Sequence, residues 1–318
     1  MTRQKIAILD LGTNTFNLLM AEISANEYRI FFSTKIPVKI GMGGINDGFI
    51  TQEACERALL AIEQYRNIID EYGVTNVYGF ATSAFRNASN GKALANEIED
   101  LYKIPVSIIS GDDEAEYIYH GVKSAINIGE KPSLIMDIGG GSIEIIIGDG
   151  KKVHWKQSFE IGAQRLLELF QKHDPILDVE VSALNSYLDE KLSSLQDAIT
   201  KFKPATIIGS SGTFDTLSNI YCEKYQLDFK QNYPEFPLTL DFFIELQASM
   251  KKMSREERVN IPGMLEMRAD MMVVACCLIE YIITKYDIKQ LRVSAYSLKE
   301  GMIRILQNKM FGSLRISI

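Results

Sequence analysis

Residues 8–15 read ILDLGTNT, and residues 135–142 read IMDIGGGS. In both segments an apolar run ends at an aspartate, Asp10 or Asp137, and a loop of small and polar residues follows. The two aspartates lie 137 − 10 = 127 residues apart. A second pair of loops, ATSAFR at 81–86 and GSSGT at 209–213, also follows apolar runs, and matching Ser211 to Thr82 gives 211 − 82 = 129. Two loops that recur in one order at nearly one spacing indicate a duplicated domain.

Each copy has the pattern of an α/β domain. In the first copy, β-branched runs predict strands at 5–9, 17–23, 29–36, 76–81 and 106–109, and apolar spacing predicts helices at 51–72, 92–102 and 112–125. In the second copy, residues 134–136 and 206–208 predict strands that lead into the loops, and the apolar run 271–279 predicts a buried helix. We therefore expect domains at 1–125 and 126–318 that face one another across a cleft. A last helix near 297–310 is expected to pack back on the first domain.

The composition limits the class of protein. A chain of 318 residues exceeds what one hydrophobic core usually organises, and its net charge of −7 excludes a global basic field for duplex nucleic acid. The apolar run at 271–279 is far shorter than the roughly 18 residues of a membrane span, and the N-terminus lacks the pattern of a signal peptide. The four cysteines form no CxxC pair. We expect a cytoplasmic protein that does not bind a membrane.

The two aspartate loops have the residue types of a phosphate and metal site. Small residues let a phosphate approach the backbone, hydroxyl and amide groups can bind it, and carboxylates can hold a hydrated divalent cation. A turn in a β-hairpin would explain the first loop alone, whereas three consecutive glycines are more than a hairpin requires. The predicted metal ligands are Asp10, Asp137 and Glu144, and the predicted phosphate contacts are Gly12, Thr13, Asn14, Gly139, Gly140, Gly141 and Ser142.

The second pair of loops adds hydroxyl groups and an arginine. Thr82 and Ser83 end a predicted strand, and Arg86 follows one helical turn later, where a guanidinium can bind phosphate oxygens. Ser211, Gly212 and Thr213 are the counterparts in the second copy. Each loop alone could be a helix cap. The acidic cluster in SGDDEAE, residues 110–116, either satisfies a helix dipole or supplies a general base, and composition does not choose which carboxylate.

Taken together, these motifs resemble the exopolyphosphatase and guanosine pentaphosphatase (Ppx/GppA) family, in the superfamily of actin, sugar kinases and chaperone ATPases. The resemblance implies two ribonuclease H-like domains around a central cleft, in the short two-domain form. It assigns the role of general base to Glu114. The matching motifs are DLGTNTF at Asp10, KIGMGG at Lys39, ATSAFR at Ala81, ISGDDEA at Ile109, DIGGGSIE at Asp137, IGAQRL at Ile161, GSSGT at Gly209, RAD at Arg268 and SLKEG at Ser297.

By this resemblance we expect an enzyme that releases terminal phosphate from inorganic polyphosphate, or from guanosine pentaphosphate, with Mg²⁺ or another divalent cation. Asn17 stands where many relatives carry Arg or His, which weakens the case for a guanosine substrate. Two alternatives are a kinase or ATPase of the same superfamily and a non-enzymatic sensor of polyphosphate or guanosine tetraphosphate. The oligomeric state is left open, with a homodimer as one option.

Overall fold

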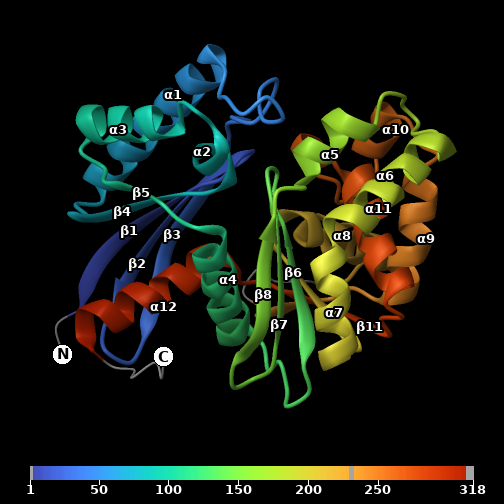
Figure 1. Ribbon diagram of the computed structural model, residues 1–318. Coiled ribbons are helices and arrows are strands. Elements are labelled where there is room, and N and C mark those ends of the chain that lie inside the picture. Colours follow the sequence, from blue (N-terminus) through green and yellow to red (C-terminus); the bar gives the residue numbers. More distant parts are fainter. Residues whose placement is uncertain (1–2, 229–232, 313–318) are drawn as a thin grey trace. The chain divides into compact units, whose positions relative to one another are not determined.

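Two mixed β-sheets organise the computed structural model, which describes residues 3–228 and 233–312 (Figure 1). The chain divides into two units, and each sheet belongs to one of them. The first unit contains the residues up to Gly121 together with the segment from Leu298, and the second runs from Val122 to Ser297. The chain passes from the first unit to the second within helix α4 (Gly111–Ala125).

The first unit has a five-stranded sheet in the order β3-β2-β1-β4-β5. Strands β1, β2 and β3 are antiparallel neighbours, and β4 and β5 continue the sheet parallel to β1. Figure 1 shows α1 and α3 on one face of this sheet and α4 and α12 on the other. The elements are β1 (Gln4–Leu11), β2 (Thr15–Ile23), β3 (Tyr28–Pro37), α1 (Gln52–Glu71), β4 (Asn76–Ala81), α2 (Ser83–Asn87), α3 (Gly91–Tyr102), β5 (Val106–Ile108), most of α4, and α12 (Leu298–Phe311).

The second unit has a six-stranded sheet in the order β10-β11-β9-β6-β7-β8. Its elements are β6 (Ser133–Ile138), β7 (Ile143–Gly148), β8 (Val153–Phe159), α5 (Ala163–Phe170), α6 (Asp178–Lys191), α7 (Ser193–Phe202), β9 (Thr206–Ser210), α8 (Ser211–Tyr225), β10 (Glu235–Phe236), α9 (Leu240–Met250), α10 (Arg255–Val259), the 3-10 helix η1 (Glu266–Arg268), α11 (Met272–Lys285) and β11 (Gln290–Ser294).

The two sheets repeat one topology. Strands β6, β7, β8, β9 and β11 have the order and relative directions of β1, β2, β3, β4 and β5, and the short β10 is an addition. This is the strand order of a ribonuclease H-like domain, so the predicted fold class of two such α/β domains is confirmed. The repeat that the loops indicated is therefore a repeat of the whole sheet.

Burial follows the sequence pattern of each strand. Every residue of β6 (SLIMDI) and β7 (IEIIIG) is buried, as expected for near-continuous apolar strands that are covered on both faces. Strand β3, at the sheet edge, alternates partly buried and exposed residues along much of its length. The apolar run at 271–279 lies in α11, which is buried as predicted.

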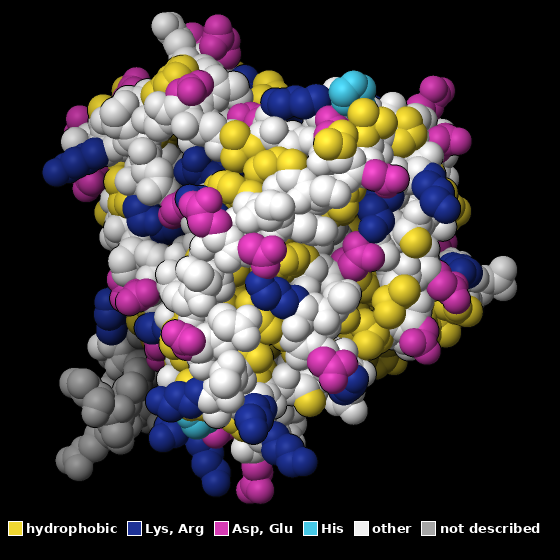
Figure 2. Space-filling view, turned by 45° about the vertical axis from the view of Figure 1, so that its right-hand side comes forward, with side chains coloured by type: hydrophobic (Ala, Val, Ile, Leu, Met, Phe, Trp, Pro, Cys, Tyr) yellow, Lys and Arg dark blue, Asp and Glu magenta, His cyan; other side chains and the backbone are white. Residues whose placement is uncertain are grey.

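The surface in Figure 2 shows acidic and basic side chains interspersed over most of the face in view. No single sign of charge dominates that face, in keeping with the modest net charge. Within residues 3–228 and 233–312, no helix has the length and apolar character to span a membrane.

Candidate active site

In the first unit, Asp10 lies near the end of β1, next to the hairpin turn that leads into β2. It faces Asn17 across the strand pair, and Asn17 Nδ2 donates a hydrogen bond of 2.9 Å to Asp10 Oδ2. The turn residues Thr13 and Asn14 are buried. The loop is therefore the hairpin tip that its position between two strands predicted.

The segment that follows β3 packs on this turn. The carbonyl of Asn14 accepts hydrogen bonds of 2.9 Å from the amides of both Val38 and Lys39, and the carbonyl of Thr13 accepts one of 3.2 Å from Gly41. Arg57 of α1 donates to the carbonyls of Val38 and Lys39, at 2.9 and 3.0 Å. The backbone hydrogen bonds fix the carbonyl groups of Thr13 and Asn14.

The ATSAFR loop adjoins the same end of the sheet. The amide of Thr82 donates to the carbonyl of Leu11 at 3.3 Å, and the amide of Ile109 donates to the carbonyl of Ala81 at 3.0 Å. Thr82 and Ser83 are both buried. The structure thus brings the loops after β1, β4 and β5 together at the carboxyl ends of three parallel strands, the usual place for a ligand in such sheets.

Glu114 stands apart from the rest of its acidic cluster. It is 6% exposed, and Arg86 Nη1 donates a hydrogen bond of 3.0 Å to its Oε2. The same Arg86 nitrogen donates to the carbonyl of Ile109 at 3.1 Å. Asp113, in contrast, is exposed and exchanges hydrogen bonds with Ser110 at the start of α4. Ser110 thus caps the helix by accepting from the Asp113 amide, and the Asp113 carboxylate only accepts from that hydroxyl, whereas Glu114 forms a buried ion pair.

The second unit has a carboxylate pair where the first has Asp10 and Asn17. Asp137 lies opposite Glu144 across β6 and β7, and the offset 144 − 17 = 127 equals that of the two aspartates. Both carboxylates are buried. Ser158 Oγ donates to Glu144 Oε1 at 2.6 Å. The duplicated hairpin thus carries two acids in the second unit and one acid with an amide in the first.

Hydrogen bonds join Asp137 to the last residue of β9 and to the segment that follows β11. Ser210 Oγ donates to Asp137 Oδ2 at 2.8 Å, and Ser297 Oγ donates to the same oxygen. Burial raises the pKa of Asp137, while hydrogen bonds from Ser297, Ser210 and Ser211 and the charge of Arg268 act to lower it. The net rise means that burial disfavours the ionised carboxylate more than these hydrogen bonds and the charge of Arg268 favour it.

The triple-glycine loop is a hairpin turn, and the group that approaches it closely belongs to the protein. A Cβ on Gly162 would lie 2.4 Å from the carbonyl carbon of Gly140, so only glycine fits there. The amides of Ala163, Gln164 and Gly162 donate to the carbonyls of Gly139, Gly140 and Gly141 at 2.9, 2.9 and 3.1 Å. Arg165 Nε also donates to the Gly141 carbonyl, at 2.8 Å. The loop's carbonyls are thus held by Gly162 and the first residues of α5, and the Gly139 amide closes the turn by donating to the carbonyl of Ser142 at 3.0 Å.

The GSSGT loop joins β9 to α8. Ser211 has a left-handed backbone with φ of +67°, a conformation that costs energy in a residue other than glycine and is often found at functional sites. Thr213 is buried. In the sheet, Asp10 pairs with Phe80 and Asp137 pairs with Ser210, an offset of 210 − 80 = 130. The offset of 129 that was predicted from the loop sequences is thus one residue smaller than the offset between the paired strands.

Arg268 is a candidate that sequence reasoning missed. Its guanidinium lies against Gly212, where an added Cβ would come within 2.1 Å of Nη2. Burial lowers the pKa of Arg268, and the charges of Asp215 and Asp137 act against that shift. The RAD motif at 268–270 was a signal for it, although nothing in the local sequence indicates that RAD meets the GSSGT loop.

The carboxylates Asp137 and Glu144 are the types of ligand that a hydrated divalent cation takes. Mg²⁺ keeps several waters and is usually held by one or two carboxylates together with substrate phosphates. The buried pair Asp137 and Glu144 suits this pattern. Asp10, the third predicted ligand, belongs to the first unit. Within the described residues, no three or more His, Cys, Asp or Glu side chains form a group that could hold a metal ion by themselves.

Comparisons with known proteins agree on one family. Residues 19–309 match the Ppx/GppA phosphatase family. A crystal structure of an exopolyphosphatase from Cytophaga hutchinsonii is 41% identical, with a TM-score of 0.93 over 96% of this chain and 98% of that one.

Two curated relatives are longer proteins. A bifunctional 3-dehydroquinate synthase/phosphatase of Fusobacterium nucleatum is 29% identical over 87% of this chain and 43% of its own length. A guanosine-5'-triphosphate,3'-diphosphate pyrophosphatase of Photobacterium profundum is 24% identical over 96% of this chain and 59% of its own length. This chain thus spans about half the length of these two relatives. Because the family match covers nearly the whole sequence, the chain belongs to the Ppx/GppA phosphatase family.

Proposed function

We propose that this protein hydrolyses the terminal phosphoanhydride bond of inorganic polyphosphate. The observation that carries the proposal is the buried ion pair between Glu114 and Arg86, beside the hydroxyl-rich ATSAFR loop. A carboxylate held next to an anion-binding loop is suited to take a proton from water that attacks phosphorus. The high similarity to the Cytophaga hutchinsonii exopolyphosphatase supports this choice of substrate.

In this mechanism the protein mainly positions groups and stabilises charge. Glu114 accepts the proton of the attacking water. Arg86 fixes the direction of that carboxylate through its hydrogen bond and places a positive charge beside it. The hydroxyls of Thr82, Ser83, Ser142, Ser211 and Thr213, and the amides of the two hairpin turns, bind phosphoryl oxygens.

Asp137 and Glu144 would hold a divalent cation, with Mg²⁺ the best match to two buried carboxylates. When bound, such an ion neutralises charge on phosphate oxygens. Ser210 and Ser158 orient the two carboxylates through hydrogen bonds of 2.8 and 2.6 Å. Asp10, hydrogen-bonded by Asn17, is proposed as the counterpart in the first unit.

Guanosine pentaphosphate is the second candidate substrate. The Photobacterium profundum relative, whose name describes that activity, matches 96% of this chain. Neither the kinase nor the sensor alternative gains support, since the three relatives named above are a bifunctional synthase/phosphatase, a pyrophosphatase and an exopolyphosphatase. We also propose a cytoplasmic location, because all four cysteines are free thiols.

The proposal is tested by measuring free phosphate from long polyphosphate, tripolyphosphate, guanosine pentaphosphate and ATP, each with Mg²⁺. We expect fastest release from polyphosphate and loss of release in Glu114→Gln. Release of phosphate from ATP and from none of the other substrates would indicate an ATPase. Transfer of the ATP γ-phosphoryl group to an added sugar, with ADP formed and no free phosphate, would indicate a kinase. Binding of polyphosphate without any release would indicate the sensor.

A further inference from the structure

Arg258 of α10 is a fully buried arginine outside the candidate site. Its side chain donates hydrogen bonds to three acceptors. Nε donates to the carbonyl of Ala269 at 3.0 Å, and Nη1 donates to Asp174 Oδ1 at 2.7 Å and to the carbonyl of Met253 at 2.5 Å. Burial of a guanidinium is costly unless the group is paired and hydrogen-bonded, and these three acceptors meet that requirement.

Arg255, one turn earlier on the same helix, makes parallel contacts. Its backbone amide donates to Asp174 Oδ2, and its Nε donates to Asp270 Oδ1, both at 2.5 Å. Asp174 thus anchors α10 through both of its carboxylate oxygens. The two arginines in turn hold Ala269 and Asp270, the two residues that follow Arg268 in the chain.

The held segment presents Arg268 to the GSSGT loop. The amide of Arg268 donates to the carbonyl of Leu265 at 2.8 Å, and its own carbonyl accepts from Met271 at 2.9 Å, so the backbone there is fixed on both sides. The guanidinium lies against Gly212, at the first turn of α8. Planar guanidinium groups bind phosphate through paired hydrogen bonds, which require accurate placement.

We propose that Asp174, Arg255 and Arg258 form a positioning network that fixes Arg268 against Gly212 for contact with a substrate phosphoryl group. The substrate class rests on the proposed function. None of the three network residues contacts the substrate in this proposal. Arg258 acts through the carbonyl of Ala269, Arg255 through the carboxylate of Asp270, and Asp174 through the two arginines. Pre-organisation of this kind matters because a misplacement of about 1 Å at an active site can cost about 10²-fold in rate.

The test is a double-mutant cycle on kcat/KM with polyphosphate. Arg268→Ala should lower kcat/KM by about 10² to 10³, the usual loss of one donor to a transition-state oxygen. Asp174→Ala should lower it by about 10-fold or more in the otherwise unchanged protein. If Asp174 acts through Arg268, adding Asp174→Ala to Arg268→Ala should have almost no further effect. Asp174 is partly exposed, and Arg255→Gln, at an exposed side chain, gives a second variant should Asp174→Ala fold poorly.

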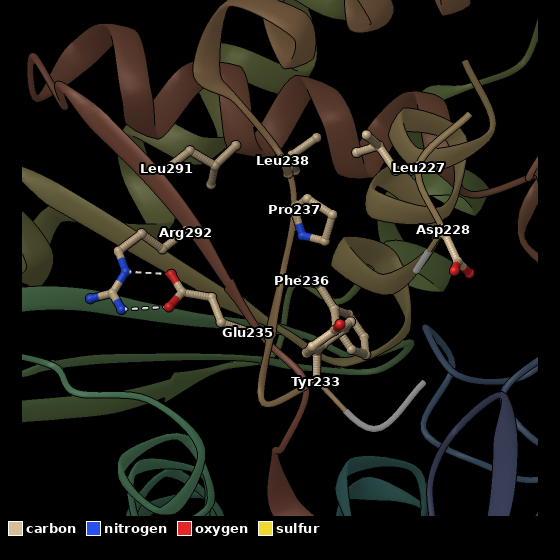
Figure 3. A pocket seen from close by; sticks show the side chains of 9 residues that line it. All are labelled: Leu227, Asp228, Tyr233, Glu235, Phe236, Pro237, Leu238, Leu291 and Arg292. Atoms are coloured by element: carbon tan, nitrogen blue, oxygen red, sulfur yellow. Dashed lines mark hydrogen bonds and ion pairs between the residues drawn. The ribbon is translucent and has the colours of Figure 1, made fainter. Parts of the chain in front are cut away.

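Arg292→Gln is the matched control within the same unit. Arg292 donates to both carboxylate oxygens of Glu235, at 2.7 and 2.9 Å. Both residues are among the nine that line a pocket, and none of the nine is a candidate site residue (Figure 3). Breaking this ion pair should leave kcat/KM unchanged. If it lowered kcat/KM as much as Asp174→Ala does, the network would have no special link to the site and the proposal would fail.

Amide hydrogen exchange of residues 264–272 gives a readout that does not depend on the activity. Asp174→Ala should raise exchange in this segment, and Arg292→Gln should not. The network would be overturned if Asp174→Ala left the exchange of this segment unchanged. It would also be overturned if Asp174→Ala lowered kcat/KM by the same factor whether residue 268 is arginine or alanine. Failure of the wild-type protein to release phosphate from any polyphosphate would instead overturn the proposed function, and the exchange result would still decide the positioning.

Discussion

Replacing Glu114 by glutamine removes a proton acceptor while keeping the side chain's size. The wild-type carboxylate is 6% exposed and accepts a hydrogen bond of 3.0 Å from Arg86. The amide oxygen of glutamine can still accept that hydrogen bond, so we expect Arg86 to keep its place. What is lost is the group that takes a proton from water.

The expected loss of turnover follows from that role. Removal of a general base from an otherwise intact site lowers kcat by about 10² to 10⁴, equivalent to about 2.7 to 5.4 kcal/mol of barrier. Substrate affinity should change little, because uncharged glutamine adds no repulsion to an anion. A residue that only satisfied the helix dipole would behave differently. Its loss would cost about 0.3 to 1 kcal/mol of stability and leave kcat unchanged.

The assay is steady-state phosphate release from polyphosphate, with binding measured separately by calorimetry. Asp113→Asn is the control, since Asp113 is exposed and its carboxylate accepts a hydrogen bond from Ser110 Oγ. It should keep most of the wild-type kcat. Wild-type turnover by folded Glu114→Gln would refute the assignment, and Glu116, which lies 3.3 Å from His120, would become the next candidate.

Three further predictions concern the second unit. Asp137→Ala and Glu144→Ala should each raise the Mg²⁺ concentration for half-maximal activity, by about 10-fold or more, and full turnover in excess chelator would contradict a metal requirement. Because burial raises the pKa of Asp137 above its unfolded value, the metal-free protein should gain stability as pH falls through the folded pKa, and Asp137→Asn should abolish that gain in thermal unfolding experiments. Gly162→Ala places a Cβ 2.4 Å from Gly140, so it should cost about 1 to 3 kcal/mol of stability in denaturant unfolding and weaken phosphate binding, and an unchanged midpoint would contradict the packing.

Much of the fold was predictable because its signals are local. The apolar run before Asp10 predicted a strand at 5–9, and the structure has β1 at Gln4–Leu11. The amphipathic spacing at 51–72 became α1 at Gln52–Glu71, capped by Thr51. The strand predicted at 17–23 begins at Thr15, because the hairpin turn is tighter than the loop motif indicated. Strand β10 has two residues, too few to leave a periodic pattern.

The candidate site was predictable in part, because some of its contacts join residues close in the sequence and others join residues far apart. The pairing of Asp137 with Glu144 spans a short hairpin and was visible as carboxylates that flank GGG. The network around Arg258 joins residues 84 positions apart, which no periodicity reveals. The three glycines were interpreted as room for a ligand, whereas Gly162 also occupies that space. The selection of Glu114 from its acidic cluster came from the resemblance, and the structure supplies a physical difference, since Glu114 is the buried, paired member.

The most direct test of the central claim is the fate of water oxygen during turnover. The protein is incubated with long-chain polyphosphate and Mg²⁺ in water enriched in oxygen-18, and the released orthophosphate is analysed by mass spectrometry. Attack of water on the terminal phosphorus predicts one labelled oxygen in each phosphate released. Glu114→Gln should release far less phosphate, by the factor of about 10² to 10⁴ given above, and what it releases should carry the same single label. Release of unlabelled phosphate, or no release with polyphosphate or guanosine pentaphosphate, would contradict the account.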